Sequence, residues 1–111
     1  MPQPVVHFEI GCRDLPSTRA FYEAAFDWNI ANDQTHPAGG IPGHFTSLGH
    51  EPHQYVSFYI QVDDVAAALE KVVLCGGKKV VGPLQIPTGT FAWFSDPGGN
   101  MLGLWRPAPA G

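Results

Sequence analysis

The sequence VVHFEIGCRDL at residues 5–15 returns 50 positions later as YVSFYIQVDDV at residues 55–65. Four of the eleven positions are identical, and both copies end in an aspartate followed by an aliphatic residue. The apolar side chains of each copy fall largely at every second position, so they lie on one face of a strand while the intervening side chains lie on the other. The repeat therefore predicts two modules of the same kind, each opened by a strand.

A helix is predicted after each copy. The first helix begins after Asp14, and Pro16 lies in its first turn, where a missing N–H costs nothing. The second helix begins after Asp64 and ends at Gly76-Gly77, a pair suited to a left-handed C-terminal cap. Each helix carries an apolar stripe that is expected to pack on a sheet: Phe21, Tyr22, Ala25 and Phe26 in the first, and Val65, Ala68, Leu69, Val72 and Val73 in the second.

Three strands are predicted after the second helix, at 79–85, 90–95 and 101–106, because strong turn sequences separate them. In the first module, residues 27–34 are predicted to form one strand, 35–43 a loop rich in Gly and Pro, and 44–48 a last strand. The predicted fold class is α+β, with tandem βαβββ modules that form curved mixed sheets around a cavity, the first module being shortened. The predicted core is Phe8, Ile10, Phe58, Ile60, Leu69 and Val72.

Length and composition limit the classes of protein to which the chain can belong. A chain of 111 residues is expected to form a single domain, with module one at about 4–50 and module two at about 54–107. Six basic and ten acidic residues without a basic cluster argue against a nucleic-acid partner. No apolar run reaches the length of a membrane span, and no signal peptide is visible, so we expect a cytoplasmic protein without a membrane partner.

The strand face opposite the predicted helices has the character of a small-molecule site, since it combines aromatic walls with a few polar groups. Glu9 on this face is a candidate general base, although a carboxylate at a wet cavity mouth is an equal alternative. The predicted cavity residues are His7, Glu9, Ser57, Tyr59, Gln61, Trp93, Met101 and Trp105.

The tandem βαβββ pattern and the final Asp96-Pro97-Gly98-Gly99-Asn100, followed by Leu102-Gly103-Leu104-Trp105, resemble the vicinal oxygen chelate superfamily. This superfamily includes glyoxalases, extradiol dioxygenases and bleomycin-resistance proteins, and the ending Gly103-Leu104-Trp105 resembles that of its small glyoxalase-like proteins. The resemblance implies four metal-ligand positions. It places His7 and His44 at two of them, but Ser57 and Gly103 at the other two. A divalent metal would thus have an incomplete ligand set, and a polar role for His7 in lining the cavity is the alternative.

Two hypotheses of function follow from the resemblance. The first is a glyoxalase- or bleomycin-resistance-like protein that binds a small organic molecule without a complete metal site. The second is a metal-dependent lyase, isomerase or dioxygenase that uses His7. A homodimer is also expected, because the shortened first module leaves a sheet edge and the tryptophans Trp28, Trp93 and Trp105 for a partner to cover.

Overall fold

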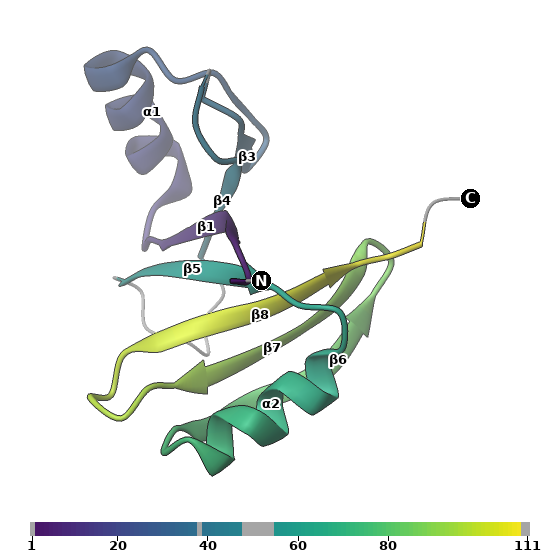
Figure 1. Ribbon diagram of the computed structural model, residues 1–111. Coiled ribbons are helices and arrows are strands. Elements are labelled where there is room, and N and C mark those ends of the chain that lie inside the picture. The colour runs from purple at the N-terminus through teal and green to yellow at the C-terminus, as the bar shows by residue number, and fades with distance from the viewer. Residues whose placement is uncertain (1, 38, 48–54, 110–111) are drawn as a thin grey trace. The chain divides into compact units, whose positions relative to one another are not determined.

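The computed structural model describes residues 2–37, 39–47 and 55–109, and these residues form two helices and eight strands (Figure 1). The chain divides into two compact units. The first unit is Val6–Ser57, and the second unit combines Met1–Val5 with Phe58–Gly111. Within the described residues, neither helix is long and apolar enough to cross a membrane.

The first unit follows the order β1 (Val5–Gly11), α1 (Leu15–Phe26), β2 (Ile30–Ala31), β3 (Gln34–Thr35) and β4 (Gly43–Thr46). Its strands lie in the order β2-β3-β4-β1. Strand β1 runs parallel to β4, whereas the other two pairs are antiparallel. The sheet is therefore mixed, as predicted.

The second unit repeats this plan with longer strands. It contains most of β5 (Tyr55–Gln61), followed by α2 (Val65–Leu74), β6 (Lys78–Ile86), β7 (Gly89–Ser95) and β8 (Met101–Pro107). The strands lie in the order β5-β8-β7-β6, and β5 again runs parallel to the last strand of its module. The α+β class and the two βαβββ modules predicted from the repeat are confirmed.

Helix α2 covers one face of the sheet in the second unit (Figure 1). The Asp64 side chain accepts a hydrogen bond from the Ala67 N–H at 3.0 Å, so the predicted cap is present. Gly76 ends the helix with φ +103°. The predicted stripe packs on the sheet except for Val73, which is exposed. The core beneath the helix consists of Val62, Val65, Leu69, Ala92, Phe94 and Leu104.

Helix α1 packs less deeply than its stripe predicted. Phe21 and Phe26 are 57% and 60% exposed, and no residue of the helix is fully buried. The helix instead contacts its core through Leu15 and Tyr22, which lie two turns apart on one side. The prediction that all four stripe residues pack on the sheet is wrong, because the small core of Cys12, Ile30 and Phe45 reaches only one side of the helix.

Phe58 is a second correction, since it is 45% exposed and does not belong to the core. Its place on the α2 face of β5 was predicted correctly, because Ile60 two residues later packs against the α2 core. That core extends along β5 only from Ile60 onward, so Phe58 lies beyond its end. Among the other predicted core residues, Phe8 and Leu69 are buried, and Ile10, Ile60 and Val72 are half-buried.

The segment predicted as one strand at 27–34 is instead a short hairpin. Strand β2 ends at Ala31, and β3 begins at Gln34 and runs antiparallel to it. Asn32 lies in the turn with φ +61°, a conformation that asparagine adopts more readily than most residues. The strand predicted at 44–48 is β4 at Gly43–Thr46, and residue 48 lies outside the described residues.

Candidate functional site

Two neighbouring strands bring a cluster of polar side chains together in the first unit. Glu9 of β1 lies directly opposite His44 of β4 in the parallel register. His7 precedes Glu9 by two residues, so it points to the same face of β1. Its Nε2 atom lies 2.6 Å from Nδ1 of His44. The sequence therefore predicted three members of one real cluster, although the two histidines are 37 positions apart.

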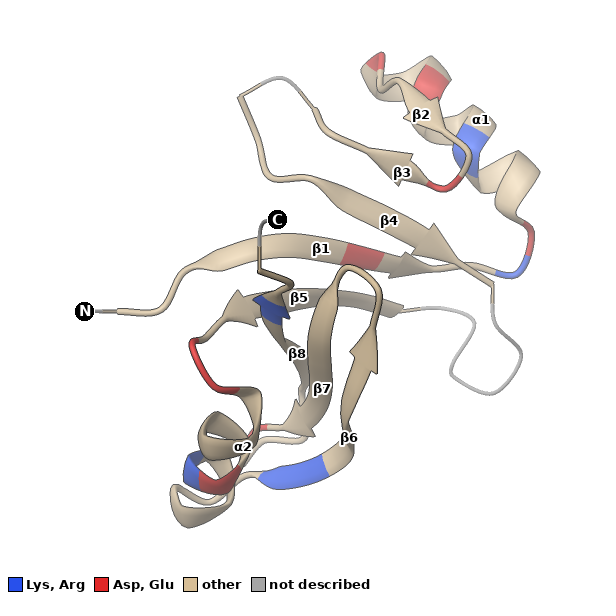
Figure 2. Ribbon diagram, turned by 90° about the vertical axis from the view of Figure 1, so that its right-hand side faces the viewer, with Lys and Arg blue, Asp and Glu red and all other residues tan. Residues whose placement is uncertain are grey.

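Glu9 is a buried carboxylate with partners on both oxygens. Its side chain is the only acidic one on β1 (Figure 2), and the residue is 3% exposed. The Tyr55 hydroxyl donates a hydrogen bond to Oε2, and Nε2 of His44 lies 3.7 Å from Oε1. A buried carboxylate without such partners would cost several kcal/mol, on the order of a lost charge-assisted hydrogen bond. The alternative of a carboxylate at a wet cavity mouth does not fit this burial.

The surroundings of His7 favour its neutral form. Burial lowers the pKa of His7, the neighbouring His44 lowers that pKa further, and Glu9 raises it in part. A neutral imidazole has one N–H and one bare nitrogen, so one ring donates and the other accepts in the His7–His44 hydrogen bond. The cluster can thus offer both a proton donor and a proton acceptor to a bound molecule.

Tyr55 completes the cluster, and no site role was predicted for it. Its ring lies against Gly11, where an added Cβ would be 2.1 Å from a ring carbon. Glycine at this position therefore lets the tyrosine lie flat on β1 and reach Glu9. The alternation along β5 could have identified Tyr55, since it shares a strand face with Ser57 and Tyr59.

A second group of predicted residues lies in the second unit. The indole N–H of Trp93 donates a hydrogen bond to the Tyr59 hydroxyl at 2.9 Å, which joins β7 to β5 across β8. Tyr59 is buried, and Trp93, Met101 and Trp105 are half-buried. Gln61 is exposed, and it lies opposite Trp105 in the register. Phe91 also belongs to this group, because it lies between Trp105 and Leu84 in the register, and the sequence prediction missed it.

The residues at the four implied metal positions do not fit a four-ligand centre. His7 and His44 are imidazoles, but the buried hydroxyl of Ser57 is a poor ligand for a divalent metal, and Gly103 has no side chain. A Cβ at Gly103 would lie 2.3 Å from the Tyr59 ring, so the tyrosine occupies the space of a ligand there. Among the described residues, no three His, Cys, Asp or Glu side chains form a group that could hold a metal ion.

The strand register is consistent with the ligand position that the resemblance implies for His44. His44 pairs with Glu9 in the first module, and Gly103 pairs with Tyr59 in the second. Glu9 and Tyr59 are equivalent in the repeat, since 50 positions separate them. The two modules therefore place His44 and Gly103 at equivalent positions of their sheets.

The family model for the Glyoxalase/Bleomycin resistance protein/Dioxygenase superfamily matches residues 5–104. The chain belongs to this superfamily. "Putative glyoxylase CFP32" of Mycobacterium tuberculosis is 31% identical over 86 residues, which is 77% of this chain and 29% of that protein. The same named protein of Mycobacterium bovis matches to the same extent. The chain thus spans less than a third of the length of these curated relatives.

Several solved structures share the fold of this chain. Methylmalonyl-CoA epimerase of Streptomyces coelicolor, solved with 2-nitronate-propionyl-CoA, has a TM-score of 0.70 at 15% identity over 99% of this chain and 98% of that chain. The epimerase of Mycobacterium tuberculosis has a TM-score of 0.68 at 16% identity, with 95% of this chain and 88% of that chain covered. A glyoxalase/bleomycin resistance protein/dioxygenase superfamily member of Vibrio splendidus has a TM-score of 0.65 at 14% identity, with 96% and 100% covered. These likenesses confirm the fold predicted from the repeat.

Proposed function

We propose that this superfamily member binds a small organic molecule directly through the His7, Glu9, His44 and Tyr55 side chains, without a four-ligand metal centre. The observation that carries the proposal is the buried Glu9 carboxylate, which is held by the Tyr55 hydroxyl and lies beside His44. Burying a carboxylate is costly, and a protein that needed only stability would do as well with an apolar side chain there. The pKa of the neighbouring His7 is lowered by burial, and titratable groups with perturbed pKa values concentrate at functional sites.

Ser57, in the same unit as the cluster, remains a proposed further contact, and Glu9 remains the proposed general base if the bound molecule reacts. In the second unit, the predicted cavity residues Tyr59, Gln61, Trp93, Met101 and Trp105 remain proposed small-molecule contacts. Glu9 accepts a hydrogen bond from the Tyr55 phenol and lies 3.7 Å from the His44 imidazole, so its carboxylate has a proton donor on one side and a titratable ring on the other. The cytoplasmic location remains a prediction.

The second candidate is a metal-dependent lyase, isomerase or dioxygenase that uses His7. The close pair of imidazoles from His7 and His44 is the observation that favours it. Metal analysis of protein purified without a histidine tag separates the two candidates. A stoichiometric metal that is lost in His7→Ala would favour the enzyme, and its absence in both proteins would favour direct binding.

The proposed binding can be tested by thermal shift measurements against a set of soluble metabolites. We expect at least one compound to raise the melting temperature of the wild type but not that of His7→Ala or Glu9→Gln. His36→Ala is the matched control, because His36 is exposed in the same unit and lies outside the cluster. A compound that stabilises the wild type and His7→Ala equally would contradict a role for the cluster.

A further inference from the structure

One face of the sheet in the second unit is lined by aromatic side chains. Ala92, Phe94 and Leu104 point toward α2, so their neighbours Phe91, Trp93, Gly103 and Trp105 point to the opposite face. Two cross-strand rows describe this face, which we call the aromatic face: Tyr59, Gly103, Trp93 and Val81 form one row, and Gln61, Trp105, Phe91 and Leu84 form the next.

Glycines let two rings of the aromatic face lie close against the sheet. The ring of Tyr59 lies over Gly103, and the indole of Trp105 lies over Gly89, where added Cβ atoms would be 2.3 Å and 2.7 Å from the respective ring carbons. The hydrogen bond between Trp93 and Tyr59 holds those two rings in fixed positions. Rings that lie along a sheet in this way offer their faces to a planar molecule, which stacks on them better than a bulky saturated one.

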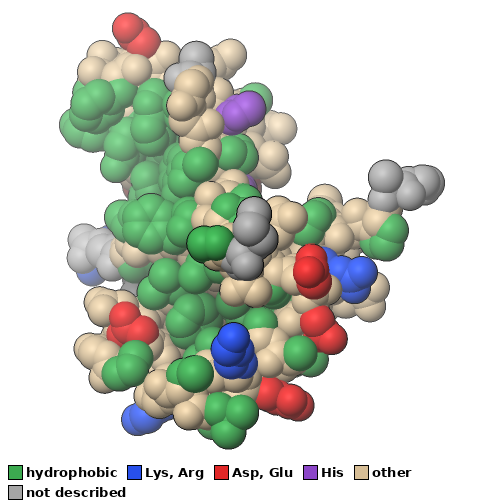
Figure 3. Space-filling view, viewed as in Figure 1, with side chains coloured by type: hydrophobic (Ala, Val, Ile, Leu, Met, Phe, Trp, Pro, Cys, Tyr) green, Lys and Arg blue, Asp and Glu red, His purple; other side chains and the backbone are tan. Residues whose placement is uncertain are grey.

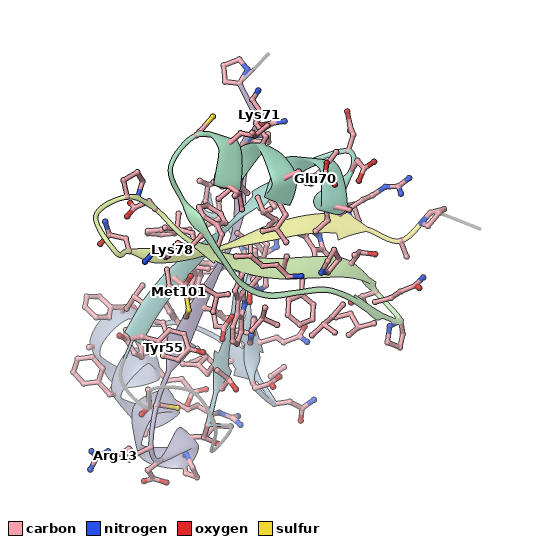
Figure 4. All side chains as sticks on the ribbon, turned by 90° about the horizontal axis from the view of Figure 1, so that it is seen from below. Arg13, Tyr55, Glu70, Lys71, Lys78 and Met101 are labelled. Atoms are coloured by element: carbon pink, nitrogen blue, oxygen red, sulfur yellow. The ribbon has the colours of Figure 1, made fainter. Side chains whose placement is uncertain are left out.

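Charge is confined to one end of the aromatic face. Among the described residues of β6, β7, β8 and 58–61, Lys78 is the one charged side chain on this face. It lies opposite Ser95, which in turn lies opposite Met101 (Figure 4 labels Lys78 and Met101). Lys79 and Arg106 lie opposite Phe94 and Thr90, so they belong to the α2 face. The row of Lys78 is two residues, or about 7 Å, from the row of Trp93.

We propose that the aromatic face binds a planar aromatic carboxylate. Its ring system stacks on the half-buried Trp93 and Trp105, and its carboxylate lies toward the ammonium group of Lys78. The lysine is exposed, so the ion pair contributes little affinity and mainly orients the ligand, whereas stacking supplies most of the binding. This inference goes beyond the proposed function, because the aromatic face lies in the second unit and the cluster of His7, Glu9, His44 and Tyr55 lies in the first.

The test is isothermal titration calorimetry of the full chain with three probes. They are 2-naphthoate, its uncharged amide, and decahydro-2-naphthoate, which keeps the charge but loses the planar rings. We expect 2-naphthoate to bind at least tenfold more tightly than the saturated acid, and a few-fold more tightly than the amide. Trp105→Leu should weaken 2-naphthoate at least tenfold, whereas Phe21→Leu on α1 should leave its affinity unchanged.

Adjacent lysines on opposite faces provide the control for charge. Lys78→Gln should remove the preference for 2-naphthoate over the amide, and Lys79→Gln should keep it. Circular dichroism verifies that each variant is folded.

Equal affinities for the planar and saturated acids would overturn the proposal, as would equal effects of the two lysine substitutions. If 2-naphthoate does not bind but a metabolite stabilises the protein in a His7-dependent way, this inference fails and the proposed function stands. If no compound binds in either experiment, both fail.

Discussion

Gly103 shows at a single residue why a metal ligand is missing from the second module. A Cβ at this position would lie 2.3 Å from the Tyr59 ring, far closer than van der Waals contact. We therefore expect Gly103→Ala to destabilise the fold by about 1–3 kcal/mol through overpacking. Urea denaturation measures the change. Gly98→Ala is the matched control, because its Cβ would have ordinary contacts at 3.5 Å and 3.6 Å. An unchanged unfolding free energy in Gly103→Ala would show that Tyr59 does not occupy this space.

His7 makes the stability of the chain depend on pH. Burial and the neighbouring His44 lower the pKa of His7 below its ordinary value of 6.5. The unfolded chain therefore binds a proton more readily than the folded chain, so the unfolding free energy falls as the pH decreases through 6.5. The fall ends once the pH is below the lowered pKa of the folded state. We expect His7→Gln to show a smaller loss between pH 7.5 and pH 5 than the wild type, as measured by urea denaturation. His36→Gln should lose as much as the wild type, and a His7→Gln profile identical to the wild type would contradict this account.

At the scale of elements, the two helices begin at equivalent aspartates but differ in their caps. The Asp64 side chain accepts a hydrogen bond from Ala67 N–H, whereas the Asp14 side chain makes no capping hydrogen bond to α1. Asp64→Ala should therefore cost about 1 kcal/mol of stability, and Asp14→Ala should cost less than half of that. Thermal and urea unfolding of the two variants measure the difference. Equal losses in the two variants would show that the capping hydrogen bond of Asp64 adds no stability beyond what Asp14 provides.

The elements of the second module were predicted well because local signals there agree with one another. Strands β6, β7 and β8 begin and end within one residue of the predicted ranges 79–85, 90–95 and 101–106. The first module was predicted less well. Its hairpin at 30–35 is too short to leave a periodic pattern, and the apolar side chains of α1 do not reveal which of them the small core can reach.

At the scale of the whole molecule, we expect the homodimer to form through apolar surface rather than through sheet edges. The edge strand β6 carries Lys78, Lys79, Pro83 and two register shifts, which oppose pairing, and β2 has only two residues. Hydrophobic side chains instead reach the surface over α1, where Phe21 and Phe26 are exposed (Figure 3). Light scattering should give about twice the chain mass of 12.0 kDa for the wild type, and a lower value for Phe21→Glu. A mass near 12.0 kDa at every concentration would exclude the dimer.

The site was predictable where the repeat specifies strand faces, and unpredictable where a side chain's partners come from distant strands. Alternation along β1 placed His7 and Glu9 on one strand face, and the family resemblance placed His44 at a ligand position together with His7. The burial of Glu9 depends on Tyr55, which is 46 positions away and contacts it only because Gly11 leaves room for the ring. No local pattern in the sequence encodes such a contact.

Native mass spectrometry of the untagged chain, incubated with a metabolite mixture, tests the central claim most directly because one spectrum reports bound metal and bound organic molecule together. Direct binding through the cluster predicts a wild-type species that carries an organic molecule and no metal ion. It also predicts that the same species is absent in His7→Ala, in which the imidazole pair is lost. A wild-type species that carries one metal ion per chain, and loses it in His7→Ala, would contradict the account.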